Sequence, residues 1–200
     1  MSMPNLSRRS CLASLACAGL LAAGAGRKSF AAGEARTPAA AGKKAVILCY
    51  TRTNNTGTIA AFIRAATGAP LLMIEPREAY AEDYDAMTGI ARAEKRSGSR
   101  RELKTVLPDL SAFDVVFIGS PIWWGGISVP MFTLLSDHPL EGKLVLPFLT
   151  SGSSAPRQAE DEILALCPKA RIQKAFWTPG SRAASSEGAV REWLQENKLI

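Results

Sequence analysis

Ala45-Val46-Ile47-Leu48-Cys49-Tyr50, a continuous apolar run, opens directly into the polar stretch Thr51-Arg52-Thr53-Asn54-Asn55-Thr56-Gly57. A short apolar run without alternating polar residues is typical of a strand covered on both faces, as in a parallel sheet. The next segment, Thr58–Thr67, places Ile59 and Ile63 on one helical stripe and therefore predicts a helix. A strand, a polar loop and a helix in succession are the opening unit of an α/β fold.

A second apolar run, Val115-Val116-Phe117-Ile118-Gly119, opens into Ser120-Pro121-Ile122-Trp123-Trp124-Gly125-Gly126. Two adjacent indoles in a turn bounded by proline and glycine expose a large apolar area unless something covers them. A flat aromatic ligand stacked on one indole would cover that area, and glycine lets the backbone approach the edge of such a ring. The alternative is that both tryptophans fold into the core beneath the loop.

Strand-like and helix-like segments alternate along the rest of the chain. The expected strands are Ala45–Tyr50, Leu71–Glu75, Asp114–Gly119, Leu144–Thr150 and Ala170–Trp177. The expected helices are Thr58–Thr67, a helix with a following loop within Glu82–Lys104, Pro130–Leu135, Gln158–Leu166 and Ser186–Asn197. Five strands alternating with helices indicate a parallel sheet covered on both faces. Ligands of such sheets bind beyond the carboxyl ends of the strands, so the loops after the first, third and fourth strands are expected to converge.

The loop after the first strand is rich in hydrogen-bond donors. Its threonines and asparagines, with the free amides at the start of the next helix, favour a phosphate group. Neither the Gly-Lys-Ser/Thr of nucleoside-triphosphate loops nor a G-x-G-x-x-G dinucleotide fingerprint follows the strand. A phosphate at this loop and a planar ring at the Trp123-Trp124 turn describe a mononucleotide such as FMN. The alternative for this loop is a polar helix cap without a ligand.

These motifs resemble those of the flavodoxin superfamily, and most closely those of its stand-alone flavodoxin-like branch. The similarity rests on residues 51–56 and 119–125 and extends from Lys43 to the C-terminal helix. It implies an α/β, flavodoxin-like three-layer sandwich with a five-stranded parallel sheet of order 2-1-3-4-5. It also implies FMN, with its phosphate at Thr51–Thr56 and its isoalloxazine ring between the Trp123-Trp124 loop and the Thr150–Ser154 loop.

The candidate cofactor-binding residues come from these three loops, and none is assigned a catalytic or metal-binding role. They are Thr51, Arg52, Thr53, Asn54, Asn55, Thr56, Pro121, Ile122, Trp123, Trp124, Gly125, Thr150, Ser151, Gly152 and Ser153. Trp123 and Trp124 are the candidate stacking platforms, and the Gly125 backbone is the candidate partner of the reduced flavin N5–H. Family members often have glycine where Asn54 stands, and asparagine tolerates a left-handed backbone.

The first 31 residues have the features of an export signal. Ser7-Arg8-Arg9-Ser10-Cys11-Leu12 precedes an uncharged run rich in Ala, Leu and Gly, and Ser29-Phe30-Ala31-Ala32 offers a cleavage site. The paired arginines resemble the core of a twin-arginine signal, with Cys11 at the position that usually holds Phe. The alternative is an alanine-rich tail with incidental arginines. The apolar run is too short and too poor in large side chains for a comfortable membrane span.

We therefore expect an export signal at residues 1–31, a flexible linker at 32–42 and a folded domain at 43–200. Removing residues 1–31 removes four cations and no acids, so the formal charge falls from +6 to +2. No basic block then remains to bind nucleic acid. The only histidine, His138, lacks the G-x-S-x-G sequence of a serine hydrolase and is expected in a surface turn. No Cys/His cluster indicates a metal site, and Cys49 and Cys167 are expected to be separate buried thiols.

Together these features predict an exported, periplasmic flavoprotein that binds FMN non-covalently and takes part in electron transfer. Its expected partners are FMN and either a redox protein or a quinone-like acceptor, with no stable membrane span. Two alternatives stay open. One is an FMN-dependent reductase linked to NAD(P)H or quinones, and the other is a flavodoxin fold without flavin that serves as an interaction module.

Overall fold

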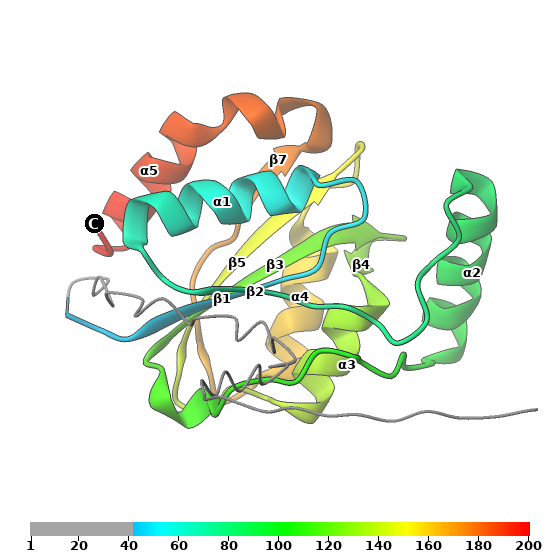
Figure 1. The fold of residues 1–200 in the computed structure, drawn as a ribbon, viewed down its shortest axis with the longest axis horizontal. Coiled ribbons are helices and arrows are strands. Elements are labelled where there is room, and N and C mark those ends of the chain that lie inside the picture. The colour runs from blue at the N-terminus through cyan, green and yellow to red at the C-terminus, as the bar shows by residue number, and fades with distance from the viewer. Residues whose placement is uncertain (1–41) are drawn as a thin grey trace, which may run out of the picture. The chain divides into compact units, whose positions relative to one another are not determined.

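The computed structural model describes residues 42–200, which form an α/β unit built on one mainly parallel sheet (Figure 1). Its strands are β1 (Ala45–Cys49), β2 (Leu71–Met73), β3 (Val115–Trp123), β4 (Gly126–Ile127), β5 (Leu144–Ser151), β6 (Arg171–Ile172) and β7 (Phe176–Pro179). The strand order is β2-β1-β3-β5-β6, with β7 also pairing with β5 and β4 pairing with β3. Numbered as the five expected strands, this order is 2-1-3-4-5, so the predicted flavodoxin-like fold is confirmed.

Helices cover both faces of the sheet. They are α1 (Asn55–Thr67), α2 (Tyr84–Ser97), α3 (Val129–Asp137), α4 (Arg157–Leu166) and α5 (Glu187–Glu196), with 3₁₀ turns η1 (Leu110–Ala112) and η2 (Gly180–Ser185). Figure 1 shows α1 and α5 together on one face and α3 and α4 on the other. No helix within residues 42–200 is long and apolar enough to cross a membrane.

Alternate residues of the central strands pack into two separate cores. Ile47 faces the core under α1 and α5, whereas its neighbour Leu48 faces the core under α3 and α4. Phe117 and Ile118 of β3 divide in the same way. Because successive strand side chains point to opposite faces, a strand between two helical layers must be apolar at every position. This requirement explains the uninterrupted apolar run that opens the domain.

Two strands differ from the expected segments. β3 does not end at Gly119 but continues to Trp123, because its residues pair with β5 as far as Pro121 and then with β4. The expected fifth strand is divided into β6 and β7. It breaks because the amide of Ala175 turns away and donates to the Glu160 side chain at 3.0 Å.

The helices begin and end close to the expected residues. α1 stops where Gly68 takes a left-handed conformation with φ of 66°. Asp83 caps the start of α2, and its carboxylate accepts a 2.7 Å hydrogen bond from the amide of Ala86. His138 is exposed at the end of α3, as expected. The predicted export signal and residues 32–41 of the predicted linker lie outside the described residues.

Candidate functional site

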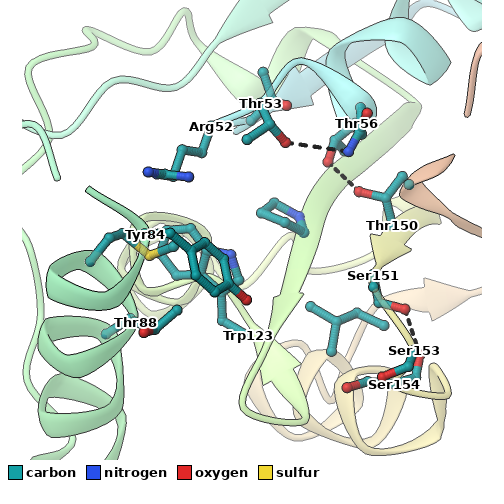
Figure 2. A pocket seen from close by; sticks show the side chains of 18 of the residues that line it. Arg52, Thr53, Thr56, Tyr84, Thr88, Trp123, Thr150, Ser151, Ser153 and Ser154 are labelled. Atoms are coloured by element: carbon teal, nitrogen blue, oxygen red, sulfur yellow. Dashed lines mark hydrogen bonds between the residues drawn. The ribbon is translucent and has the colours of Figure 1, made fainter. Parts of the chain in front are cut away.

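The three loops singled out in the sequence meet at the carboxyl edge of the sheet, since β1, β3 and β5 are parallel neighbours. Pro121 of β3 lies opposite Thr150 of β5, which brings the second and third loops side by side. Together the loops line a cavity of about 490 Å³ (Figure 2). Every predicted cofactor-binding residue except Asn54 and Gly125 lines this cavity: Thr51, Arg52, Thr53, Asn55, Thr56, Pro121, Ile122, Trp123, Trp124, Thr150, Ser151, Gly152 and Ser153.

The first loop carries a row of unused backbone donors. Among residues 42–200, the amides from Thr51 to Gly57 have no protein acceptor, and the next amide, that of Thr58, donates to the Asn54 carbonyl at 2.8 Å. Asn54 has the left-handed φ of 62° expected for it, and its side chain does not cap α1. A Cβ at Gly57 would overlap the side-chain oxygen of Asn54, so a larger residue there would displace that side chain. This geometry leaves the loop amides and the positive end of α1 available to an anion.

Side chains add further donors to the same loop. The Asn55 amide donates to the Thr53 hydroxyl at 3.3 Å, which leaves the hydrogen of that hydroxyl free. Thr56 is buried, and its hydroxyl oxygen lies 2.7 Å from that of Thr150 in the third loop (Figure 2). One hydrogen is shared between these two oxygens, so the pair retains a second hydrogen to donate.

Arg52 points towards the loop that precedes α2. Its guanidinium donates to the carbonyl of Ala81 at 3.4 Å and to the carbonyl of Glu82. Arg52 is the only charged residue among those that line the cavity in the described part of the chain. The cavity therefore combines neutral donors with one cation and no carboxylate.

A tight hairpin positions the two indoles. Trp123 pairs with Gly126 across the β3–β4 turn, and Trp124 and Gly125 occupy the turn with φ of 51° and 88°. Positive φ at both central positions is the signature of a type I′ turn, whose twist matches that of the flanking strands. A side chain at Gly125 would also collide with Gln158. The segment that the sequence predicted to be a loop is thus the end of β3 followed by a two-residue turn.

The two tryptophans have different surroundings. Trp123 is partly buried and meets the rings of Tyr50 and Tyr80 edge-on, with centroids 5.6 and 4.9 Å away. Trp124 is 50% exposed, and its indole N–H donates to the Thr88 carbonyl of α2 at 3.1 Å. The guanidinium of Arg92 lies 4.8 Å from the centre of the Trp124 ring. Neither indole is fully buried in the core, contrary to the alternative considered for this loop.

A partly buried ion pair holds the hairpin against α2 and α4. Lys95 of α2 donates to the Glu162 carboxylate of α4 at 3.0 Å and to the Ile127 carbonyl at 2.8 Å. Glu162 in turn accepts a 2.7 Å hydrogen bond from the amide of Ile127. The three elements that surround the indoles are therefore fixed by one cluster of charge-assisted bonds.

The third loop is held by its own hydrogen bonds. The Ser151 hydroxyl donates to the Ser154 carbonyl at 2.7 Å and accepts from the indole N–H of Trp177 at 3.2 Å. Gly152 and Ser153 are exposed at the rim. Gly180 and Ser181 of η2 complete this side of the cavity and were not expected from the sequence.

Helix α2 forms a wall that the sequence analysis missed. Tyr84, Met87, Thr88 and Ala91 line the cavity, and Figure 2 shows Tyr84 and Thr88 projecting from this helix beside Trp123. Met87 and Ala91 are its only buried residues and are four positions apart, so they share one helical face. That spacing within a charged segment is the signal that could have identified the wall.

Both described cysteines are free and buried, as expected. Burial raises the pKa of the Cys49 thiol to about 12 and that of Cys167 to about 11. Neither thiol lines the cavity, and at neutral pH both stay protonated and unreactive.

Comparisons with known proteins agree with this architecture. The family model described as Flavodoxin matches residues 44–197. None of the curated proteins matches the chain.

Solved structures with the same fold include two from Bacteroides. A protein described as a flavoprotein from Bacteroides eggerthii is 27% identical with a TM-score of 0.68, over 77% of this chain and 97% of that one. One from Bacteroides uniformis is 27% identical with a TM-score of 0.67, over 77% and 99% of the two chains. A flavoprotein from Lactobacillus acidophilus, solved in complex with FMN, has the same fold at 20% identity, with a TM-score of 0.63 over 74% and 99%. Because the family model spans most of the sequence, the chain belongs to the flavodoxin family.

Proposed function

We propose that this protein binds FMN non-covalently in the cavity and transfers electrons through the bound flavin. The observation that carries the proposal is that one cavity joins a row of unused amides in the first loop to the indoles of the β3–β4 hairpin. Its volume of about 490 Å³ lies within the range of roughly 300–1,000 Å³ usual for small-molecule sites. The FMN complex of the Lactobacillus acidophilus neighbour supports the same ligand.

The residues at the first loop fit a phosphate monoester. The amides from Thr51 to Gly57 and the hydroxyls of Thr53 and Thr56 supply neutral donors. The positive end of α1 and the nearby Arg52 guanidinium favour negative charge, and no lining residue is acidic. This donor set holds an anion by directed hydrogen bonds without the lysine of a nucleoside-triphosphate loop.

The residues at the hairpin fit a planar ring. Trp123 and Trp124 present aromatic surface, and Ile122, Tyr84 and Met87 extend the apolar lining. Bound FMN supplies reversible one- and two-electron chemistry. The indoles disfavour an electron-rich ring stacked on them, and the hairpin holds them in place. The Gly125 backbone stays a prediction as the partner of N5–H, since Gly125 does not line the cavity.

The visible absorption spectrum of the purified protein tests the proposal. We expect a yellow protein that releases FMN, and not FAD, on denaturation. Protein that is colourless and also fails to take up added FMN would contradict the proposal and favour the interaction-module alternative. Oxidation of NADPH by the flavin-loaded protein, measured with and without a quinone, then distinguishes a reductase from an electron carrier.

We also propose that residues 1–31 direct export to the periplasm by the twin-arginine route. The support is the Ser7-Arg8-Arg9 sequence together with the proposed FMN, since proteins that acquire a cofactor before export are the usual cargo of this route. Replacing Arg8 and Arg9 together by lysine should stop transport and leave folded, flavin-loaded protein in the cytoplasm. Unchanged transport of that variant would exclude the twin-arginine route.

A further inference from the structure

Three aromatic side chains lie between the cavity described above, the first cavity, and a second cavity. Trp123 lines the first cavity, and its ring meets Tyr80 at 4.9 Å and Tyr50 at 5.6 Å between centroids. Tyr50 and Tyr80 both line the second cavity, which has a volume of about 680 Å³. Rings in direct contact give an electron a short path through bonded and touching atoms. Trp123 is thus placed between any oxidant in the first cavity and two phenols.

The two phenols differ in whether they can release a proton. The Tyr80 hydroxyl donates to the Glu94 carboxylate at 2.5 Å. The Tyr50 hydroxyl has no hydrogen-bond partner among residues 42–200. A phenol that loses an electron becomes a strong acid, so its oxidation is favourable when a base accepts the proton at once. Only Tyr80 has such a base in hydrogen-bonding contact.

Arg101 disfavours loss of an electron from Tyr80 unless the phenolic proton leaves at the same time. Its guanidinium carbon lies 3.8 Å from the centre of the Tyr80 ring, and its Nε donates to the same Glu94 carboxylate at 2.7 Å. A cation over the ring opposes the positive charge that electron loss alone would leave there. Burial, followed by the hydrogen bond to Glu94, raises the pKa of Tyr80 well above its usual range, so the phenol keeps its proton until it is oxidised.

We propose that Tyr80 is a redox-active tyrosine that passes an electron through Trp123 to a strong one-electron oxidant in the first cavity, namely a photoexcited flavin, while its proton moves to Glu94. Trp123 first gives one electron to the oxidant. Tyr80 then gives one electron to oxidised Trp123 and its phenolic proton to Glu94, which leaves a neutral tyrosyl radical beside a protonated carboxyl group. The reverse transfer restores both residues. Because the oxidant is a photoexcited flavin, the proposal rests on the proposed FMN binding.

The first experiment needs no flavin. In pulse radiolysis of the purified protein, azide radicals oxidise tryptophan by one electron, and the absorption of tryptophan and tyrosyl radicals is followed over time. We expect the tryptophan radical to decay as a tyrosyl radical forms in the wild type, with rates independent of protein concentration. Tyr80→Phe should abolish this tyrosyl signal, and Trp123→Phe should abolish its rapid formation.

The chain supplies matched controls. It contains only three tyrosines, so Tyr50→Phe tests the other ring that touches Trp123, and Tyr84→Phe tests the exposed one. Both variants should retain the tyrosyl signal. Glu94→Gln keeps a hydrogen-bond acceptor but cannot take the proton, so it should suppress the signal, and D₂O should slow its formation in the wild type. If the signal survives Tyr80→Phe, disappears in Tyr50→Phe, or is unaffected by Glu94→Gln, the proposal is wrong.

A second experiment uses FMN-loaded protein and laser excitation of the flavin. Apart from Tyr84→Phe, which alters the lining of the first cavity, the same variants should give the same pattern of tyrosyl radical formation, followed by return of the electron in the dark. Failure of the protein to take up FMN would overturn the proposed function while the radiolysis result still decides the role of Tyr80. A flavin-loaded wild type that forms no tyrosyl radical after excitation would overturn the relay to the first cavity.

Discussion

The hydroxyl oxygens of Thr56 and Thr150 lie 2.7 Å apart and join the first loop to the third across the sheet. Their residues are only 1% and 3% exposed, so little water reaches either hydroxyl. Thr56→Val or Thr150→Val alone should lower the free energy of unfolding by about 1–3 kcal/mol, because each leaves the other hydroxyl unsatisfied. The double variant should lose less than the sum of the two single losses, as urea unfolding will measure. Additive losses would show that the bond contributes nothing to stability.

The first loop is expected to determine affinity for FMN. Thr53→Ala removes a hydroxyl whose hydrogen is free, and a lost hydrogen bond to a charged group corresponds to roughly a ten- to hundredfold weaker Kd. Thr105→Ala is the control, since Thr105 bonds Glu75 and Met73 outside the cavity and its loss should leave the Kd unchanged. Fluorescence titration with FMN gives both values. Equal effects of the two substitutions would rule out a specific contact at Thr53.

The hairpin is expected to determine the potential of the flavin. Stacking on an electron-rich indole disfavours the reduced ring, so replacing the stacked indole by alanine should raise the reduction potential. We expect the full effect in only one of Trp123→Ala and Trp124→Ala, because one indole covers a ring face at a time. Thr53→Ala should leave the potential nearly unchanged, since the phosphate lies far from the ring. Potentiometric titration that shows a shift for Thr53→Ala and none for either tryptophan would reverse the assignment of the loops.

The partly buried Lys95–Glu162 ion pair is expected to contribute more to the free energy of unfolding than an exposed ion pair does. The two side chains are only 15% and 23% exposed, and Glu162→Ala would leave the Ile127 amide without its acceptor and Lys95 without its counter-charge. We expect a loss of about 1–3 kcal/mol in unfolding free energy. Glu141→Ala breaks the exposed pair with Lys169 and should change stability by less than about 1 kcal/mol. Similar losses in the two variants would contradict this ranking.

Alkaline pH should destabilise the protein through its buried thiols. In the folded state the pKa of Cys49 is about 12 and that of Cys167 about 11, against an ordinary value of 9.0. The folded protein therefore holds these protons more tightly than the unfolded chain does. The free energy of unfolding is unaffected below about pH 9 and falls above it, by up to ~1.4 kcal/mol per pH unit for each thiol. Urea unfolding between roughly pH 8 and pH 11 should show a shallower fall in Cys49→Ala.

Much of the fold was predictable because buried strands leave a strong local signal. The continuous apolar runs at Ala45–Cys49 and Val115–Gly119 mark strands covered on both faces, and the family resemblance implied the strand order that the structure has. The break between β6 and β7 was not predictable, because it depends on the amide of Ala175 meeting Glu160 from another element. A contact between two segments that are distant in the sequence leaves no pattern in the local sequence of either one.

The candidate site was predictable where it follows strand ends and not where it lies on a helix. Thr51–Thr56 and the Trp123-Trp124 pair were identified because their polar or aromatic residues directly follow apolar strands. Tyr84 and Met87 were missed because α2 lies in a segment with many charged residues, and only the tertiary structure brings it beside the cavity. A turn was expected after Trp123, but the pairing of β4 with β3 that makes it a hairpin was missed.

The small buried face of α2 means that one wall of the cavity is a helix held less firmly than α1. α2 buries only Met87 and Ala91, whereas α1 buries six residues against the sheet. Segments with few buried apolar contacts open by local unfolding at lower free energy than the core. Amide hydrogen exchange should therefore be faster in α2 than in α1 when the cavity is empty. A ligand that contacts Tyr84 and Met87 slows that exchange, so part of its binding energy is used to fold the helix that encloses it.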